Sequence, residues 1–103
     1  MKRIDSLLLF LKNSPHDSFL QHALALEYLK EGKFTDAKNL FERVLEMDPS
    51  YIGSYYHLGK LLEYTGEPAE ALECYKRGMV VAQAVADNRT FNELRAAYDA
   101  LNT

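Results

Sequence analysis

The chain has 103 residues, of which 48% are hydrophobic and 26% are charged, and its formal net charge is −3. These values are ordinary for a single globular domain, and the mild acidity argues against a nucleic-acid-binding protein, which needs clustered basic residues. Cys74 is the sole cysteine, so no intrachain disulfide can form. This cysteine usage fits a reducing compartment, and we expect a cytoplasmic protein.

The first predicted helix covers residues 2–13 and ends before Ser14-Pro15, because proline disfavours helix at the preceding residue. Its apolar run, residues 7–11, is shorter than the roughly 7–15 residues of a secretory signal and far shorter than a membrane span. We therefore expect neither. The helix has more apolar side chains than one packing face needs, so they are either buried under the following helices or available for self-association.

Two further helices follow in the first half of the chain. The second is predicted for residues 18–31 and stops at Gly32, a residue suited to a left-handed cap. The third begins near Thr35, a possible N-cap, and ends before Asp48-Pro49.

The second half predicts a similar pair and a terminal helix. Ser50 can cap a fourth helix that runs to about residue 65 and stops at Gly66. Pro68 sits where a first-turn proline is tolerated, so the fifth helix covers about residues 67–86. Asp87-Asn88 break it, and a terminal helix runs over about residues 90–101. No strand is expected.

The same pattern of residues occurs twice, 34 positions apart. The first copy reads Gln21-x2-Leu24-Ala25-x2-Tyr28, then Gly32 and Ala37-x3-Phe41, and the second reads Tyr55-x2-Leu58-Gly59-x2-Leu62, then Gly66 and Ala71-x3-Tyr75. A fixed period of this length indicates stacked helical units. The small residues at 25, 37, 59, 71 and 78 would let helix backbones approach closely.

This pattern, with its turn glycine and its closing Pro49, resembles the tetratricopeptide repeat. The resemblance implies an all-α, right-handed superhelical stack of antiparallel helix hairpins with about six helices, folded as a single domain over residues 1–103. Residues 1–17 would form an N-terminal half-repeat, 18–51 and 52–86 two full repeats, and 87–103 a capping helix. The chain departs from the pattern at Gln21, where an aromatic is expected, and at Arg95, where a small residue is expected.

The sequence contains no motif that predicts catalysis. It has no phosphate loop, dinucleotide fingerprint or nucleophile elbow. His16, His22 and His57 lack metal-ligand spacing, and we expect them to be surface or groove side chains. We therefore expect no enzyme activity, no metal and no cofactor.

The resemblance implies instead that the first helix of each hairpin lines a concave groove that binds a protein or peptide. The residues that we expect to contact the partner are His22, Leu26, Lys30, Tyr56, Lys60, Tyr64, Arg89 and Asn92. The aromatic and apolar members would supply contact area, or else pack against a neighbouring repeat. The cations would attract acidic side chains or a terminal carboxylate.

Two further interpretations follow from the resemblance. Some members of the family clamp the C-terminal carboxylate of chaperone tails, but the matching positions here are His22, Leu26, His57, Arg89 and Glu93, and only Arg89 keeps the required character. We therefore do not expect chaperone-tail clamping. The alternative function is a self-associating scaffold, a homodimer through the groove or the first helix.

Overall fold

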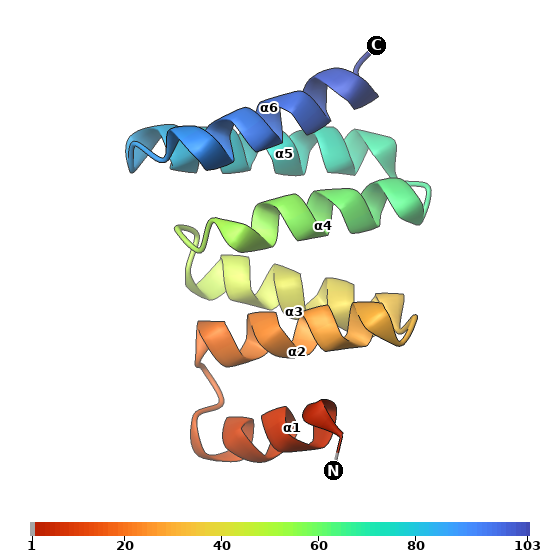
Figure 1. Cartoon of the computed structure of the whole chain (residues 1–103), viewed down its shortest axis with the longest axis vertical. Helices are drawn as coiled ribbons and strands as arrows, with labels where there is room; N and C mark the ends of the chain where they lie inside the picture. The colour runs from red at the N-terminus through yellow and green to blue at the C-terminus, as the bar shows by residue number, and fades with distance from the viewer. Residues whose placement is uncertain (1) are drawn as a thin grey trace. The chain divides into compact units, whose positions relative to one another are not determined.

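The computed structural model describes residues 2–103, which form six α-helices and no strand (Figure 1). The helices are α1 (Arg3–Asn13), α2 (Ser18–Lys30), α3 (Phe34–Met47), α4 (Gly53–Tyr64), α5 (Pro68–Ala84) and α6 (Asn88–Leu101). The predicted all-α class and the number of helices are confirmed. Contacts divide the chain into two compact units, one ending at Asp48 and the other covering Pro49–Thr103.

The first unit is built on the α2–α3 hairpin, with α1 packed against α2. Leu7, Ala23 and Leu24 form its buried cluster. From α3, Ala37 and Phe41 are fully buried. Their i, i+4 spacing, which the sequence pattern contains, puts both side chains on the face of α3 that meets α2.

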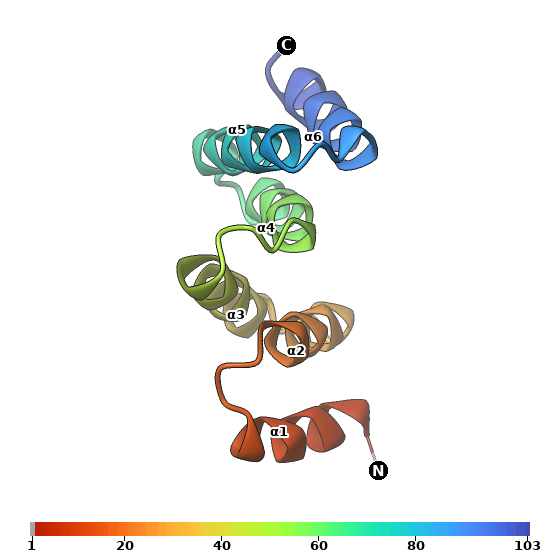
Figure 2. The same ribbon diagram turned by 90° about the vertical axis from the view of Figure 1, so that its left-hand side faces the viewer.

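In the second unit α5 packs against both α4 and α6, and Figure 2 shows the three helices next to one another. The contacts depend on two glycines. A Cβ atom at Gly59 of α4 would overlap with the ring of Tyr75 of α5. A Cβ atom at Gly78 of α5 would lie 2.7 Å from Tyr55 Cβ and 2.8 Å from Leu94 Cδ1. Only glycine leaves room for this close approach.

Two residues at equivalent repeat positions make the same hydrogen bond through different chemistry. Gln21 Nε2 donates to the Pro15 carbonyl over 2.7 Å, and Tyr55 Oη donates to the Pro49 carbonyl over 2.6 Å. The donors and the acceptors are each 34 residues apart. Gln21 therefore replaces the expected aromatic residue in its hydrogen bond, although its own Oε1 is buried and has no hydrogen-bond partner within residues 2–103.

Three turns share one backbone geometry. Gly32 and Gly66 have φ angles of 73° and 80°, which confirms the predicted left-handed caps, and Ala86 has a φ of 59° at the end of α5. In each turn the next N–H bonds to a carbonyl five residues earlier, as in Asp87 N to Ala82 O at 2.9 Å.

Two predicted caps are wrong. Helix α3 already begins at Phe34, with Lys33 as its N-cap residue, so Thr35 lies inside the first turn. Helix α4 begins at Gly53, and Ser50 does not cap it. The first α4 amides instead bond to the Tyr51 and Ile52 carbonyls.

The terminal helix also begins earlier than expected, at Asn88. Asp87 is its N-cap and accepts a hydrogen bond from Thr90 N. Asp87 therefore has two roles, since its amide closes the turn after α5 and its side chain caps α6. No N-cap was predicted for the second helix, and Asp17 caps α2 by accepting a hydrogen bond from Leu20 N at 3.0 Å.

We predict that Gly59→Ala destabilises the protein by up to about 2 kcal/mol. Forcing a methyl group into a filled core costs ~1–3 kcal/mol, and the ~1 kcal/mol that alanine gains over glycine in a helix offsets only part of this cost. Urea unfolding measures the difference. Gly53→Ala, at the exposed first residue of α4, is the matched control and should leave stability unchanged or slightly raised. Equal stability of the two variants would contradict the close packing at Gly59.

Candidate binding surface

In the first unit the expected contact residues lie four apart on α2. His22 is half-buried, and its ring packs edge-on against Phe41 of α3 with the ring centroids 5.6 Å apart. Leu26 is also half-buried, whereas Lys30 is exposed. His22 therefore packs partly within its own hairpin, and Lys30 is the most accessible of the three.

In the second unit Tyr56, Lys60 and Tyr64 are spaced in the same way on α4. Tyr56 is half-buried, with its ring edge-on to His57 at 5.9 Å. Lys60 Nζ lies 5.9 Å from the centroid of the Tyr56 ring, so the structure brings these two predicted residues together. Tyr64 is 74% exposed. An aromatic side chain this exposed is a suitable anchor for a partner.

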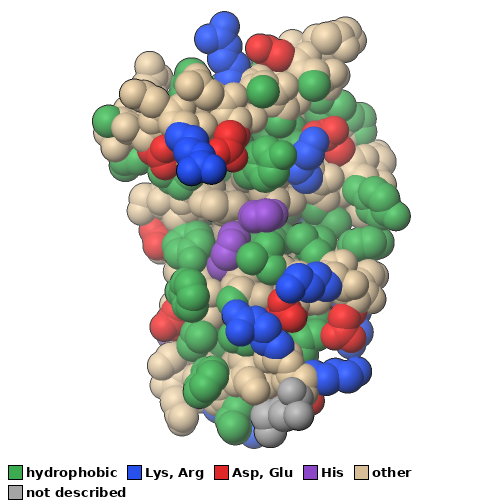
Figure 3. Space-filling model, in the orientation of Figure 1, with side chains coloured by type: hydrophobic (Ala, Val, Ile, Leu, Met, Phe, Trp, Pro, Cys, Tyr) green, Lys and Arg blue, Asp and Glu red, His purple; other side chains and the backbone are tan. Residues whose placement is uncertain are grey.

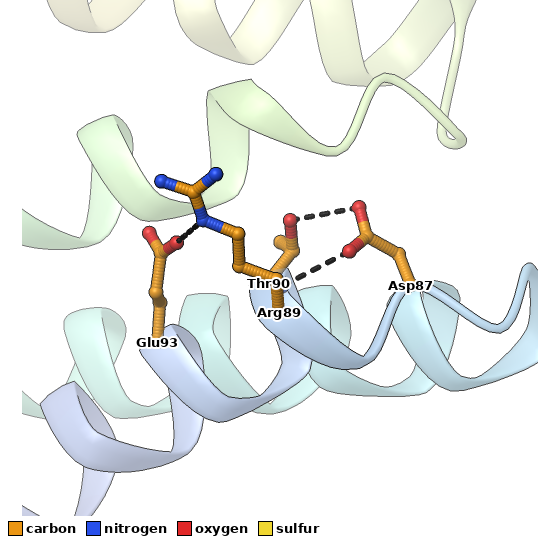
Figure 4. Close-up of polar contacts among 4 residues, drawn as sticks. All are labelled: Asp87, Arg89, Thr90 and Glu93. Atoms are coloured by element: carbon orange, nitrogen blue, oxygen red, sulfur yellow. Dashed lines mark hydrogen bonds and ion pairs between the residues drawn. The ribbon is translucent and has the colours of Figure 1, made fainter.

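The remaining two predicted residues, Arg89 and Asn92, lie exposed on α6. Arg89 Nε is 3.3 Å from Glu93 Oε1, next to the capping interaction (Figure 4). In that cap the Thr90 hydroxyl and amide both donate to the Asp87 carboxylate, and these bonds lower the pKa of Asp87. Figure 3 accordingly shows basic and acidic side chains next to one another over α6.

All three predicted cations have a carboxylate neighbour on their own helix. Lys30 Nζ lies 3.1 Å from Glu27, and Lys60 Nζ lies 3.8 Å from Glu63. The ammonium groups of both lysines are exposed although Glu27 and Glu63 are half-buried. Each lysine can therefore turn from its own carboxylate to an acidic group of a partner. Each predicted cation is thus already paired within its helix, and it can exchange this carboxylate for one of a partner.

Glu63 connects this surface to the core. The hydroxyl of the fully buried Tyr75 donates a hydrogen bond to Glu63 Oε2, the same oxygen that faces Lys60. The pKa of Tyr75 is raised far above its ordinary value, mainly by burial and then by this carboxylate. Tyr75 occupies a packing position of the repeat pattern, and the need of a buried hydroxyl for a partner was the signal for this bond in the sequence.

The half-buried position of His57 lowers its pKa through desolvation. His16 is exposed. No group of three or more His, Cys, Asp or Glu side chains within residues 2–103 is arranged to hold a metal ion. Over the same residues, none of the helices combines the length and apolar character needed to span a membrane.

We predict that Tyr75→Phe lowers the free energy of unfolding by about 1.5–3 kcal/mol, because it removes a hydrogen bond to a charged group. Chemical denaturation measures this loss. Tyr98→Phe changes a half-buried tyrosine on α6 and should be close to neutral. A Tyr75→Phe variant as stable as the parent protein would show that the bond to Glu63 does not contribute.

We predict that His57 makes the protein less stable in mild acid. Its folded-state pKa lies below the unfolded value of about 6.5, so the unfolded chain binds the proton more readily. Stability is thus complete above about pH 6.5 and declines as the pH falls through the folded-state pKa. Urea titrations between about pH 5 and pH 8 should show a smaller decline for His57→Gln, and an unchanged decline for His16→Gln. A smaller decline for His16→Gln than for His57→Gln would refute the assignment of this acid sensitivity to His57.

Comparison with known proteins supports one family. The model of the tetratricopeptide repeat family matches residues 28–98. A TPR repeat-containing protein of Pseudomonas aeruginosa is 26% identical over 91 residues, covering 88% of this chain and 87% of that protein.

Two solved structures have the same fold. The solution structure of a tetratricopeptide repeat domain protein from Salinibacter ruber aligns with a TM-score of 0.81 and 39% identity, covering 84% of this chain and 88% of that one. The TPR2B domain of yeast Sti1, solved in complex with pHsp70, aligns with a TM-score of 0.88 and 19% identity, covering 96% and 79%. Together with the helix pattern and the family match, these similarities show that the chain belongs to the tetratricopeptide repeat family.

Proposed function

We propose that this chain is a non-catalytic interaction module that binds an extended peptide or a partner helix on the α4 and α6 surface of its second unit. The preferred ligand combines an apolar or aromatic side chain with an acidic side chain or a terminal carboxylate. Its tetratricopeptide fold supports a role in protein interaction, and the yeast Sti1 domain of the same fold was solved with a partner.

The observation that carries the proposal is that the Tyr64 side chain is 74% exposed. Tyr56, Lys60 and Tyr64 follow one another at intervals of four residues on α4, so they lie along the same side of the helix. A tyrosine that is not needed for the core costs little conformational entropy when it binds and supplies large contact area. Tyr64 would be the anchor, and Tyr56 would extend the apolar contact toward Lys60.

The ion pairs explain how an acidic group would be recognised. If a ligand carboxylate takes Lys60 away from Glu63, the Glu63 carboxylate still accepts the Tyr75 hydrogen bond and is not left without a partner. Arg89 can leave Glu93 in the same way, because Glu93 is exposed to water. Both cations can therefore turn to a ligand without stranding a buried charge.

The α2 residues His22, Leu26 and Lys30 would form a smaller patch within the first unit, with Lys30 pairing to an acidic group. We propose a cytoplasmic location, since Cys74 is the sole cysteine of the chain and no intrachain disulfide can form. We propose no nucleic-acid ligand, given the net charge of −3, and no cofactor, since the sequence has no cofactor-binding motif.

A peptide library tests the proposal. Random peptides displayed on phage are selected on the immobilised full chain, and the affinity of a synthetic selected peptide is measured by calorimetry. We expect acidic peptides with an apolar residue. Tyr64→Ala should weaken binding about tenfold or more, as expected for an anchor residue. Arg89→Glu should also weaken peptide binding relative to the parent protein. This loss should grow as the salt concentration is lowered, because charges are then screened less.

Val80→Ala is the matched control, because Val80 is an exposed apolar residue on α5, outside the proposed surface, and it should leave affinity unchanged. Tyr56→Ala combined with Lys60→Ala should abolish binding, with thermal unfolding measured in parallel because Tyr56 is half-buried. Peptides that bind the Tyr64→Ala variant as tightly as the parent protein would refute the proposed surface.

A further inference from the structure

Helix α1 has two separate stripes of side chains, and only one of them packs against the rest of the first unit. Ile4, Leu7 and Leu11 face the buried cluster. Asp5, Leu8, Leu9 and Lys12 have the i, i+3, i+4, i+7 spacing of a second face, and all four are exposed. Leu8 is 43% and Leu9 54% accessible. An apolar pair with an acid at one end and a base at the other thus lies on the surface.

We propose that this stripe, Asp5, Leu8, Leu9 and Lys12, is an interface between two copies of the chain, with the two α1 helices packed antiparallel. A two-fold axis midway between Leu8 and Leu9 places Leu8 against the partner's Leu9. The same axis places Asp5 against the partner's Lys12, and Lys12 against the partner's Asp5. The stripe is therefore self-complementary in both apolar contact and charge, as a two-fold interface requires.

Charge complementarity selects both the occupant and its direction. A parallel arrangement would bring Asp5 against the partner's Asp5 and Lys12 against the partner's Lys12, which repel. Within residues 2–103 neither Asp5 nor Lys12 takes part in an ion pair. Both are thus available for the intermolecular pairs.

Helix α1 would also gain stability from a second copy. It has 11 residues, and Leu7 is its one buried side chain within the described structure. A helix of this length is marginal without packing. Leu8 also lines a groove of about 400 Å³ whose lining combines apolar residues such as Leu11 and Leu40 with polar ones such as Asp36 and Arg43.

The interface between two helices of this length falls below the ~1,200 Å² of a stable complex, so a weak, reversible dimer is expected. Sedimentation equilibrium of the full chain from about 10 µM to about 1 mM measures it. A strictly monomeric chain over this range overturns the proposal. Leu9→Glu should abolish the dimer, whereas Val80→Glu, which changes an exposed residue of α5, should not. Dimers that survive Leu9→Glu, or that Val80→Glu weakens equally, also overturn it.

Charge reversal tests the antiparallel pairing. Asp5→Lys and Lys12→Asp should each weaken self-association about tenfold, because two attractive pairs per dimer become repulsive. An equimolar mixture of the two variants should recover the parental affinity or exceed it, since each chain then meets opposite charges at both ends. Each variant has the same helix alone and in the mixture, so recovery reports pairing and not helix stability. A mixture that stays monomeric overturns the antiparallel arrangement.

The dimer is independent of the proposed peptide surface, and one variant separates them. Tyr64→Ala should leave the sedimentation equilibrium unchanged while it weakens peptide binding. Loss of the dimer in this variant would place the self-interface on α4 and overturn the assignment to α1.

Discussion

The second unit depends on the close approach of helices at two glycines. The Tyr75 ring occupies the space above Gly59, and Gly78 allows Tyr55 and Leu94 to reach the backbone of α5 from the two neighbouring helices. Both tyrosines are almost fully buried, so their hydroxyl groups need partners. Tyr55 finds the Pro49 carbonyl and Tyr75 finds Glu63, and these bonds fix the rings in the positions that the glycines permit.

The repeat preserves an interaction more strictly than it preserves a residue type. Position 21 holds glutamine and position 55 tyrosine, yet both donate to the carbonyl of a proline six residues earlier. The exchange has a physical cost, because the glutamine amide brings a second polar atom, Oε1, which is buried without a partner within the described residues. Tyrosine has no such atom. A departure from the sequence pattern can thus keep the local structure while lowering its stability.

Much of the fold was predictable because spacing alone determines which side chains face a neighbouring helix. The 34-residue period and the glycines at 32 and 66 located the hairpins and their turns, and Ala37, Phe41, Ala71 and Tyr75 are buried as the pattern predicts. The caps at Thr35 and Ser50 were wrong because α3 begins before Thr35, and because Ile52, directly before the first residue of α4, is the N-cap residue of that helix.

The candidate site was less predictable. Pairs such as Lys60 with Glu63 follow from helical spacing and could have been anticipated. The exposure of Tyr64 could not, since a tyrosine at that spacing could equally well pack on another helix. The Tyr75–Glu63 bond joins residues on different helices, and nothing in the local sequence specifies it.

The position of Glu63 also limits how this surface can change during evolution. Partly exposed residues usually vary freely, but an apolar residue at 63 would leave the buried Tyr75 hydroxyl without its acceptor. A side-chain oxygen at this position is thus needed by the core, whatever the surface above it binds. A lineage that acquires a different ligand would be expected to alter Lys60 or Tyr64 first and to keep a hydrogen-bond acceptor at 63.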